Sequence, residues 1–252
     1  MGKSNGGVSS TWETFKPVFK YNRVLWIYSN MSERHRYSDA ECAAVYRVIA
    51  ERRDMRHFLP DPVDPAVLER LLVAAHQAPS VGLMQPWRFI RITDAQLRSG
   101  IAAMVEEERH RTADALAERS DEFMRLKVAG ILECGELLVV ALTDRREQYI
   151  FGRRTLPEMD LASVACAIQN LWLTARAEGL GMGWVSLFDP EALAQLLAMP
   201  SGSKPVAIVC LGHVDAFYPA PLLKLQAWAE EHPLREMVFH NRWGHVDDSL
   251  ER

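Results

Sequence analysis

Hydrophobic residues recur along the chain at helical spacing in some segments and as short contiguous runs in others. The first pattern is typical of helices with one buried face, and the second is typical of buried strands. Helices are predicted from Ser38 to near Asp54, from Asp64 to before Ala78, from Asp94 to about Arg119, from Ser120 through Lys127, over 157–178, and from Asp189 to about Ala198. Strands are predicted over 87–92, 137–143, 183–188 and 206–211.

Capping residues mark the ends of several of these helices. Ser38 and Glu41 have the spacing of a capping box, in which each side chain bonds the backbone of the other residue. Asp64 and Asp189 each precede a proline, which is the expected order of N-cap and first helical residue. Gly179 follows the segment 157–178, where a left-handed glycine would end the helix.

The segment 157–178 is apolar on almost every helical face. Such a helix is expected to be buried nearly all round, and in a chain of 252 residues a dimer interface is one way to bury it. The predicted helices outnumber the strands and do not alternate with them as regular βαβ units. This order favours an α+β fold in which helices cover a sheet.

Composition narrows the class of protein further. The chain is 48% hydrophobic and 25% charged, with a net charge of −4, so no global basic field favours nucleic acid. No apolar run approaches the length of a membrane span or a secretory signal, so we expect a cytoplasmic protein. The four cysteines and eight histidines show no metal-ligand spacing, and we expect reduced core thiols and no metal site.

Three arginines lie within five residues, Arg52, Arg53 and Arg56, with Asp54 between them. Guanidinium groups match phosphate oxygens in bidentate geometry, so the cluster could bind a phosphorylated ligand. Taken alone, a solvated helix end is the simpler interpretation, since cations there also complement the helix dipole.

Two glycine-containing segments join helices to strands. The loop over 78–87 exposes backbone amides and a hydroxyl beside Met84 and Trp87, and either an ordinary turn or a site for a flat aromatic ligand would explain it. The glycines over 179–183 follow a helix and enter a strand, which is the wrong polarity for a dinucleotide-binding loop. Ser186 lacks the glycine frame of a nucleophile elbow.

Together these segments resemble the nitroreductase superfamily over about residues 38–244. The resemblance rests on the following motifs in this order: Glu51-Arg52-Arg53-Asp54, Ala75-His76-Gln77-Ala78-Pro79-Ser80-Val81-Gly82, Met84-Gln85-Pro86-Trp87, Met159-Asp160-Leu161, Gln169-Asn170-Leu171-Trp172, Ala175-Arg176-Ala177-Glu178-Gly179 and Gly183-Trp184-Val185-Ser186. It implies an α+β homodimer with a central, mostly antiparallel sheet covered by helices and FMN at the subunit interface. We therefore expect a flexible arm over 1–37 and a single domain over 38–252, with a helical lid at about 95–130.

Within the superfamily, the motifs are similar to the branch that makes 5,6-dimethylbenzimidazole, the lower ligand of cobalamin. The resemblance implies that reduced FMN is itself the substrate. Dioxygen would fragment it to 5,6-dimethylbenzimidazole and erythrose 4-phosphate, without a metal. A separate NAD(P)H-dependent flavin reductase would supply the reduced flavin.

The resemblance also implies roles for individual residues. Asp54 would act on a proton of the ribityl chain, and Ser186 would lie near the flavin ring. The arginines would hold the phosphate and ribityl chain. The complete set of implied flavin-binding residues is Arg52, Arg53, Asp54, Met55, Arg56, Pro79, Ser80, Val81, Gln85, Trp184, Val185, Ser186 and Gly212.

Two departures from the family pattern and two alternative functions remain. Ala162 stands where an aromatic residue is expected, and Ala229-Glu230-Glu231 stands where basic residues are expected. The alternatives are an NAD(P)H-dependent nitroreductase or flavin reductase with the same fold, and a non-enzymatic FMN-binding storage or sensor protein.

Overall fold

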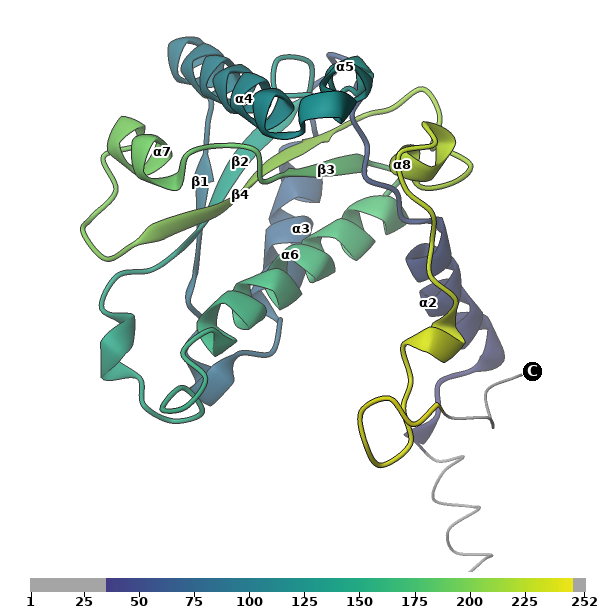
Figure 1. Ribbon diagram of the computed structural model, residues 1–252. Helices are drawn as coiled ribbons and strands as arrows, with labels where there is room; N and C mark the ends of the chain where they lie inside the picture. The colour runs from purple at the N-terminus through teal and green to yellow at the C-terminus, as the bar shows by residue number, and fades with distance from the viewer. Residues whose placement is uncertain (1–34, 247–252) are drawn as a thin grey trace, which may run out of the picture. The chain divides into compact units, whose positions relative to one another are not determined.

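The computed structural model describes residues 35–246 (Figure 1). Most of the predicted N-terminal arm over 1–37 therefore lies outside the described residues, as do the last six residues of the chain. The chain divides into two compact units, residues 1–46 and 47–252, and the sheet with the helices that cover it belongs to the second.

The order of helices and strands agrees with the order predicted from the hydrophobic pattern. The helices are α2 (Asp39–Glu51), α3 (Pro65–His76), α4 (Ala95–Ala115), α5 (Ser120–Arg125), α6 (Met159–Ala177), α7 (Pro190–Leu196) and α8 (Leu222–Leu225). The strands are β1 (Trp87–Arg91), β2 (Glu136–Leu142), β3 (Gly181–Val185) and β4 (Lys204–Gly212). Short 3-10 turns are η1 (Val81–Leu83), η2 (Ala117–Arg119), η3 (Arg146–Gln148) and η4 (Leu234–Glu236).

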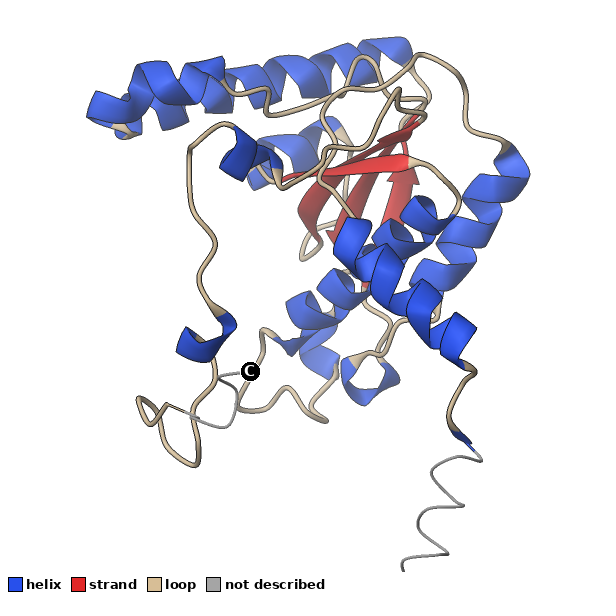
Figure 2. Ribbon diagram, turned by 90° about the vertical axis from the view of Figure 1, so that its right-hand side faces the viewer, coloured by secondary structure: helices blue, strands red, loops and turns tan. Residues whose placement is uncertain are grey.

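The strands form one sheet in the order β1-β2-β4-β3, and every neighbouring pair is antiparallel. Trp87 pairs with Leu142 at one edge of the sheet, and Gly183 pairs with Cys210 at the other. Helices lie on both faces of this sheet, α3 and α6 on one and α4 and α7 on the other (Figures 1 and 2). The prediction of an α+β fold with an antiparallel sheet covered by helices is thus confirmed.

Alternating residues of the central strands fill two separate cores. Leu138 and Val140 of β2 pack with α3 and α6, whereas Leu137 and Val139 pack with α4 and α7. Because β2 is buried on both faces, its sequence is a continuous apolar run rather than an alternating one.

The predicted caps hold the helix ends in place. The Ser38 amide donates to Glu41 Oε2, while the Glu41 amide donates to Ser38 Oγ, so the capping box is confirmed. The carboxylates of Asp64, Asp94 and Asp189 likewise accept backbone amides at the starts of α3, α4 and α7.

The predicted bounds of one helix and one strand are wrong. The helix from Ser120 ends at Arg125 and does not include Lys127, because Leu126 is extended and buries its side chain. The strand predicted over 183–188 begins at Gly181 and ends at Val185, where its pairing with β4 stops.

Helix α6 buries one face and leaves another exposed. Val164, Ile168 and Leu171 are fully buried, whereas Ala162, Cys166 and Gln169 remain exposed. Burial on nearly every face is therefore not achieved within one chain. At the C-terminal end, Gly179 adopts φ +79° and Leu180 N–H bonds Ala175 C=O, which confirms the glycine cap. None of the helices among residues 35–246 is long and apolar enough to cross a membrane.

Candidate functional site

A cavity of about 660 Å³ lies where the segment after α2 meets the end of β3. One part of it is lined by Arg52, Arg53, Asp54 and Arg56, and by residues 184–187. The rest is lined by two further sets of residues. Those within and after α5 are Phe123, Leu126, Lys127 and Val128, and those of the C-terminal segment are Pro221, Leu222, Leu223, Trp228 and Glu231. The arginine cluster and the glycine-containing strand, far apart in sequence, thus contribute to one cavity.

Backbone pairing brings the arginine cluster to β3. Once α2 ends at Glu51, the chain runs beside β3, and the Met55 amide donates to the Met182 carbonyl at 2.9 Å. Gly183 permits this approach, since a Cβ there would lie 2.3 Å from the Met55 carbonyl oxygen.

Asp54 is held by two hydrogen bonds at the cavity wall. Its Oδ1 accepts the Trp184 amide at 3.0 Å, and its Oδ2 accepts Arg56 Nη2 at 2.5 Å. Removal from bulk water raises the pKa of Asp54 above its ordinary value, although the Arg56 charge and the Trp184 amide oppose this shift. The side chain keeps 38% of its surface accessible, so the carboxylate can still be reached from the cavity.

One guanidinium nitrogen of Arg56 has no hydrogen-bond partner among the described residues. Its Nη2 also donates to the Trp184 carbonyl at 2.9 Å, whereas Nη1 is buried and has no hydrogen-bond partner among the described residues. A Cβ at Gly183 would lie 2.7 Å from this nitrogen, so glycine makes room for the guanidinium. An unpaired buried donor is costly, and such groups are often found at functional sites.

Arg52 and Arg53 differ in what their guanidinium groups contact. Arg53 Nη1 donates to the Ala50 and Arg52 carbonyls, both at 2.7 Å, and its Nε donates to the Tyr218 carbonyl at 3.1 Å. Arg52 instead stacks on Trp172, 4.5 Å from the ring centroid, without a hydrogen bond or ion pair in the described part of the chain. Arg52 is therefore available to an anion, whereas Arg53 holds the local backbone together.

The end of β3 supplies the remaining predicted residues of this cavity. Trp184 is half-buried and packs against Trp172, with ring centroids 6.4 Å apart. Val185 is buried, while Ser186 follows the strand, lines the cavity and is exposed. Within residues 35–246, the Ser186 hydroxyl has no protein partner.

The C-terminal segment supplies contacts that sequence reasoning missed. The Tyr218 hydroxyl accepts the Arg56 amide at 3.2 Å and lies 2.6 Å from His57 Nδ1. Trp228 packs on Phe123 and beneath Arg119, whose guanidinium carbon lies 3.6 Å from the ring centroid. No local spacing in the sequence indicated the partners of Tyr218 and Trp228.

The other predicted residues do not reach the cavity within one chain. Met55 is buried beside Gly181, and Gly212 packs against Gly135 and Phe58. The loop carrying Pro79, Ser80, Val81 and Gln85 contacts the opposite end of α6 from the arginine cluster.

The Val81 amide donates to Ser163 Oγ at 3.0 Å, and the Gln85 amide donates to Ser80 Oγ at 3.0 Å. Trp172, which contacts the arginine cluster, lies nine residues after Ser163 on α6, or roughly 13 Å along the helix at 1.5 Å per residue. Leu83 and Gln85 both adopt left-handed conformations, and Leu83 is 81% exposed. Such backbone strain tends to occur at functional sites.

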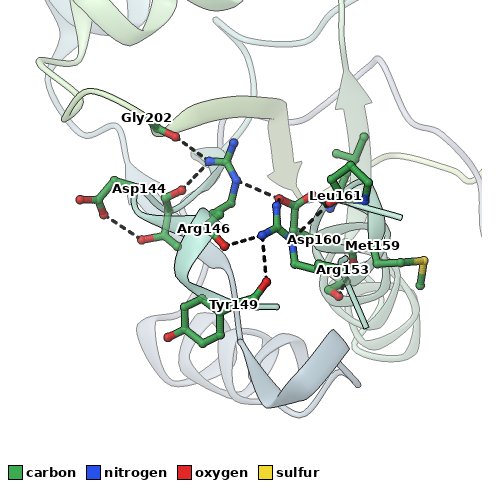
Figure 3. Close-up of polar contacts among 11 residues, drawn as sticks. Asp144, Arg146, Tyr149, Arg153, Met159, Asp160, Leu161 and Gly202 are labelled. Atoms are coloured by element: carbon green, nitrogen blue, oxygen red, sulfur yellow. Dashed lines mark hydrogen bonds and ion pairs between the residues drawn. The ribbon is translucent and has the colours of Figure 1, made fainter. Parts of the chain in front are cut away.

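A buried carboxylate anchors the neighbouring loop (Figure 3). Asp160 Oδ2 accepts Arg146 Nε and Arg153 Nη2, both at 2.9 Å, while its Oδ1 accepts the Leu161 amide. The segment held in this way packs on the Val81–Leu83 turn, since a Cβ at Gly82 would lie 3.1 Å from the Phe151 carbonyl oxygen. Asp160 therefore indirectly supports the loop that contains Ser80.

Comparison with known proteins agrees with this architecture. The model of the nitroreductase family matches residues 49–213. A 5,6-dimethylbenzimidazole synthase of Rhodospirillum rubrum is 40% identical over 187 residues, covering 72% of this chain and 87% of that protein. The chain belongs to the nitroreductase family.

Solved structures extend the likeness to the fold. A BluB-like flavoprotein from Clostridium difficile superposes with a TM-score of 0.61 at 17% identity, covering 79% of this chain and 99% of that one. An iodotyrosine deiodinase, solved with FMN and 3-iodo-L-tyrosine, has a TM-score of 0.58 at 25% identity. That alignment covers 69% of this chain and 92% of the deiodinase.

We expect Asp160→Asn to lower the free energy of unfolding by about 3 kcal/mol, because it leaves two partly buried guanidinium groups without their shared carboxylate. Urea denaturation measures the change. Glu158→Gln is the matched control, because Glu158 is exposed two residues away and makes no capping bond. Equal stability of the two variants would contradict a structural role for Asp160.

Proposed function

We propose that this chain is a 5,6-dimethylbenzimidazole synthase, which uses dioxygen to fragment reduced FMN into 5,6-dimethylbenzimidazole and erythrose 4-phosphate. The observation that carries the proposal is the Asp54 carboxylate, fixed between Arg56 and the Trp184 amide at the wall of a ligand-sized cavity. The relative from Rhodospirillum rubrum, which bears this name, supports the choice of reaction.

The cavity has groups that suit a flavin nucleotide. Arg52 is a free cation for the phosphate, and its stacking on Trp172 leaves the edge of the guanidinium open. The exposed Ser186 hydroxyl suits the polar edge of the ring. Arg53 would act on the flavin indirectly, by holding the backbone of the cavity wall through the Tyr218 carbonyl. Met55 would also act indirectly, because its hydrogen bond to Met182 keeps the arginine cluster beside β3.

A second copy of the chain would complete the site. Ala162, Cys166 and Gln169 form an exposed stripe at helical spacing on α6. If two copies paired antiparallel through this stripe, the loop at the start of one α6 would approach the cavity at the end of the other. Pro79, Ser80, Val81, Gln85 and the strained Leu83 would then reach the flavin from the partner, and Gly212 would support the sheet behind it.

The flavin, Asp54 and Ser186 would have separate roles in the proposed reaction. The reduced flavin supplies the electrons that dioxygen accepts. Asp54 would take a proton from the ribityl chain, for which a carboxylate with a raised pKa is better suited than an ordinary one. Ser186 would orient the ring, and a separate NAD(P)H-dependent reductase would supply reduced FMN.

Aerobic incubation of the purified protein with chemically reduced FMN is expected to consume flavin and yield 5,6-dimethylbenzimidazole, measured by mass spectrometry. The alternative reductase would instead oxidise NAD(P)H directly and regenerate intact flavin. Intact reoxidised flavin, without the benzimidazole, would reject the proposal and favour the alternatives.

We expect Asp54→Asn to bind FMN but to lose product formation, because the amide cannot accept the proton. In the wild type, product formation should rise with pH as Asp54 ionises, and this rise should lie above the ordinary carboxylate pKa because the pKa of Asp54 is raised. A pH–rate profile under single-turnover conditions measures both effects. Unchanged product formation by Asp54→Asn would exclude the carboxylate as the base.

Arg52→Ala is expected to weaken FMN binding by about 1.5–3 kcal/mol, the scale of hydrogen bonds to charged groups, while affecting riboflavin much less. Fluorescence titration measures both affinities. Arg125→Ala removes the same charge from an exposed position outside the cavity and serves as the control. If Arg52→Ala lost the same affinity for FMN as for riboflavin, Arg52 would not be the residue that binds the phosphate.

A further inference from the structure

The cavity contains a carboxylate that opposes the proposed phosphate site. Its charged lining residues are Arg52, Arg53, Arg56, Lys127, Asp54 and Glu231. Asp54 is paired with Arg56, but Glu231 comes from the C-terminal segment, where the family pattern led us to expect basic residues. Glu231 therefore adds a negative charge to the cavity that is proposed to receive a dianionic phosphate.

Glu231 is fixed by its own ion pair. Lys224 Nζ lies 2.7 Å from Glu231 Oε2, and Lys224 directly follows the lining residue Leu223. This hydrogen bond lowers the pKa of Glu231, and the charge of Arg53 lowers it further. Glu231 is therefore ionised at neutral pH, and it also holds Lys224, a cation that a phosphate could otherwise attract.

We propose that Glu231 is a specificity-determining residue that weakens recognition of the flavin phosphate, so that this chain distinguishes FMN from riboflavin less strongly than Arg52 alone would allow. The inference rests on the proposed function, because it assumes that a flavin occupies this cavity. Two effects act in the same direction: Glu231 repels the phosphate dianion, and its ion pair keeps Lys224 from contributing attraction. Weaker binding of the phosphate also favours release of the product erythrose 4-phosphate.

The adjacent Glu230 provides a matched comparison. Both glutamates are exposed and carry the same charge, but only Glu231 lines the cavity. Replacing either one with glutamine changes the net charge equally, so a general field effect would act on both variants. A local effect on phosphate would appear for Glu231 alone.

The test measures the dissociation constants of FMN and riboflavin by flavin fluorescence at low and high salt. Glu231→Gln should raise the ratio of the riboflavin constant to the FMN constant two- to fivefold at low salt, the scale of a solvent-exposed charge pair. The gain should shrink at high salt, where exposed charges are screened. Glu230→Gln should leave the ratio unchanged, and Lys224→Gln added to Glu231→Gln should remove part of the gain.

An unchanged ratio in Glu231→Gln, or the same change in Glu230→Gln, would overturn the inference. Thermal denaturation of each variant shows whether it is folded, and Glu231→Asp, which keeps the charge, should retain the wild-type ratio. If the wild type binds flavin and forms the benzimidazole but the ratio does not respond, only this inference fails. If the wild type binds neither flavin, both this inference and the proposed function fail.

Discussion

The site depends on one backbone contact, the hydrogen bond from the Met55 amide to the Met182 carbonyl. This contact places residues 52–56 along β3 and sets Asp54 opposite the Trp184 amide. It is possible only because Gly183 has no side chain, since a Cβ there would collide with the Met55 carbonyl. The charged cluster is thus positioned by the sheet rather than by the helix that precedes it.

Much of the fold could be predicted from local sequence because local forces fix it. The carboxylate caps at Asp64, Asp94 and Asp189 need only neighbouring amides, and the apolar run of β2 needs only burial on two faces. The incorrect boundary after Arg125 has a different origin. Leu126 leaves the helix to bury its side chain beside Phe123, a tertiary preference that helical spacing does not contain.

The site could be predicted only in part, because the roles of its residues depend on distant partners. The sequence placed Arg52, Arg53 and Arg56 together but could not distinguish them. Trp172 leaves Arg52 free, whereas the carbonyl of Tyr218 engages Arg53, and neither partner is adjacent in sequence. The Ser80 loop is a further case, because its proposed meeting with the cavity requires a second copy of the chain.

The cations of the cavity consequently contribute less free charge than their number suggests. Arg56 is paired with Asp54, Lys127 lies 2.8 Å from Glu133, and Arg53 is engaged by carbonyls. Only Arg52 remains uncommitted within the described residues, so it would supply most of the attraction for an anionic ligand. With one uncommitted cation, a single opposing carboxylate offsets a larger share of that attraction than it would among several free cations, which is why Glu231, as a residue lining the cavity, is proposed to act on ligand choice.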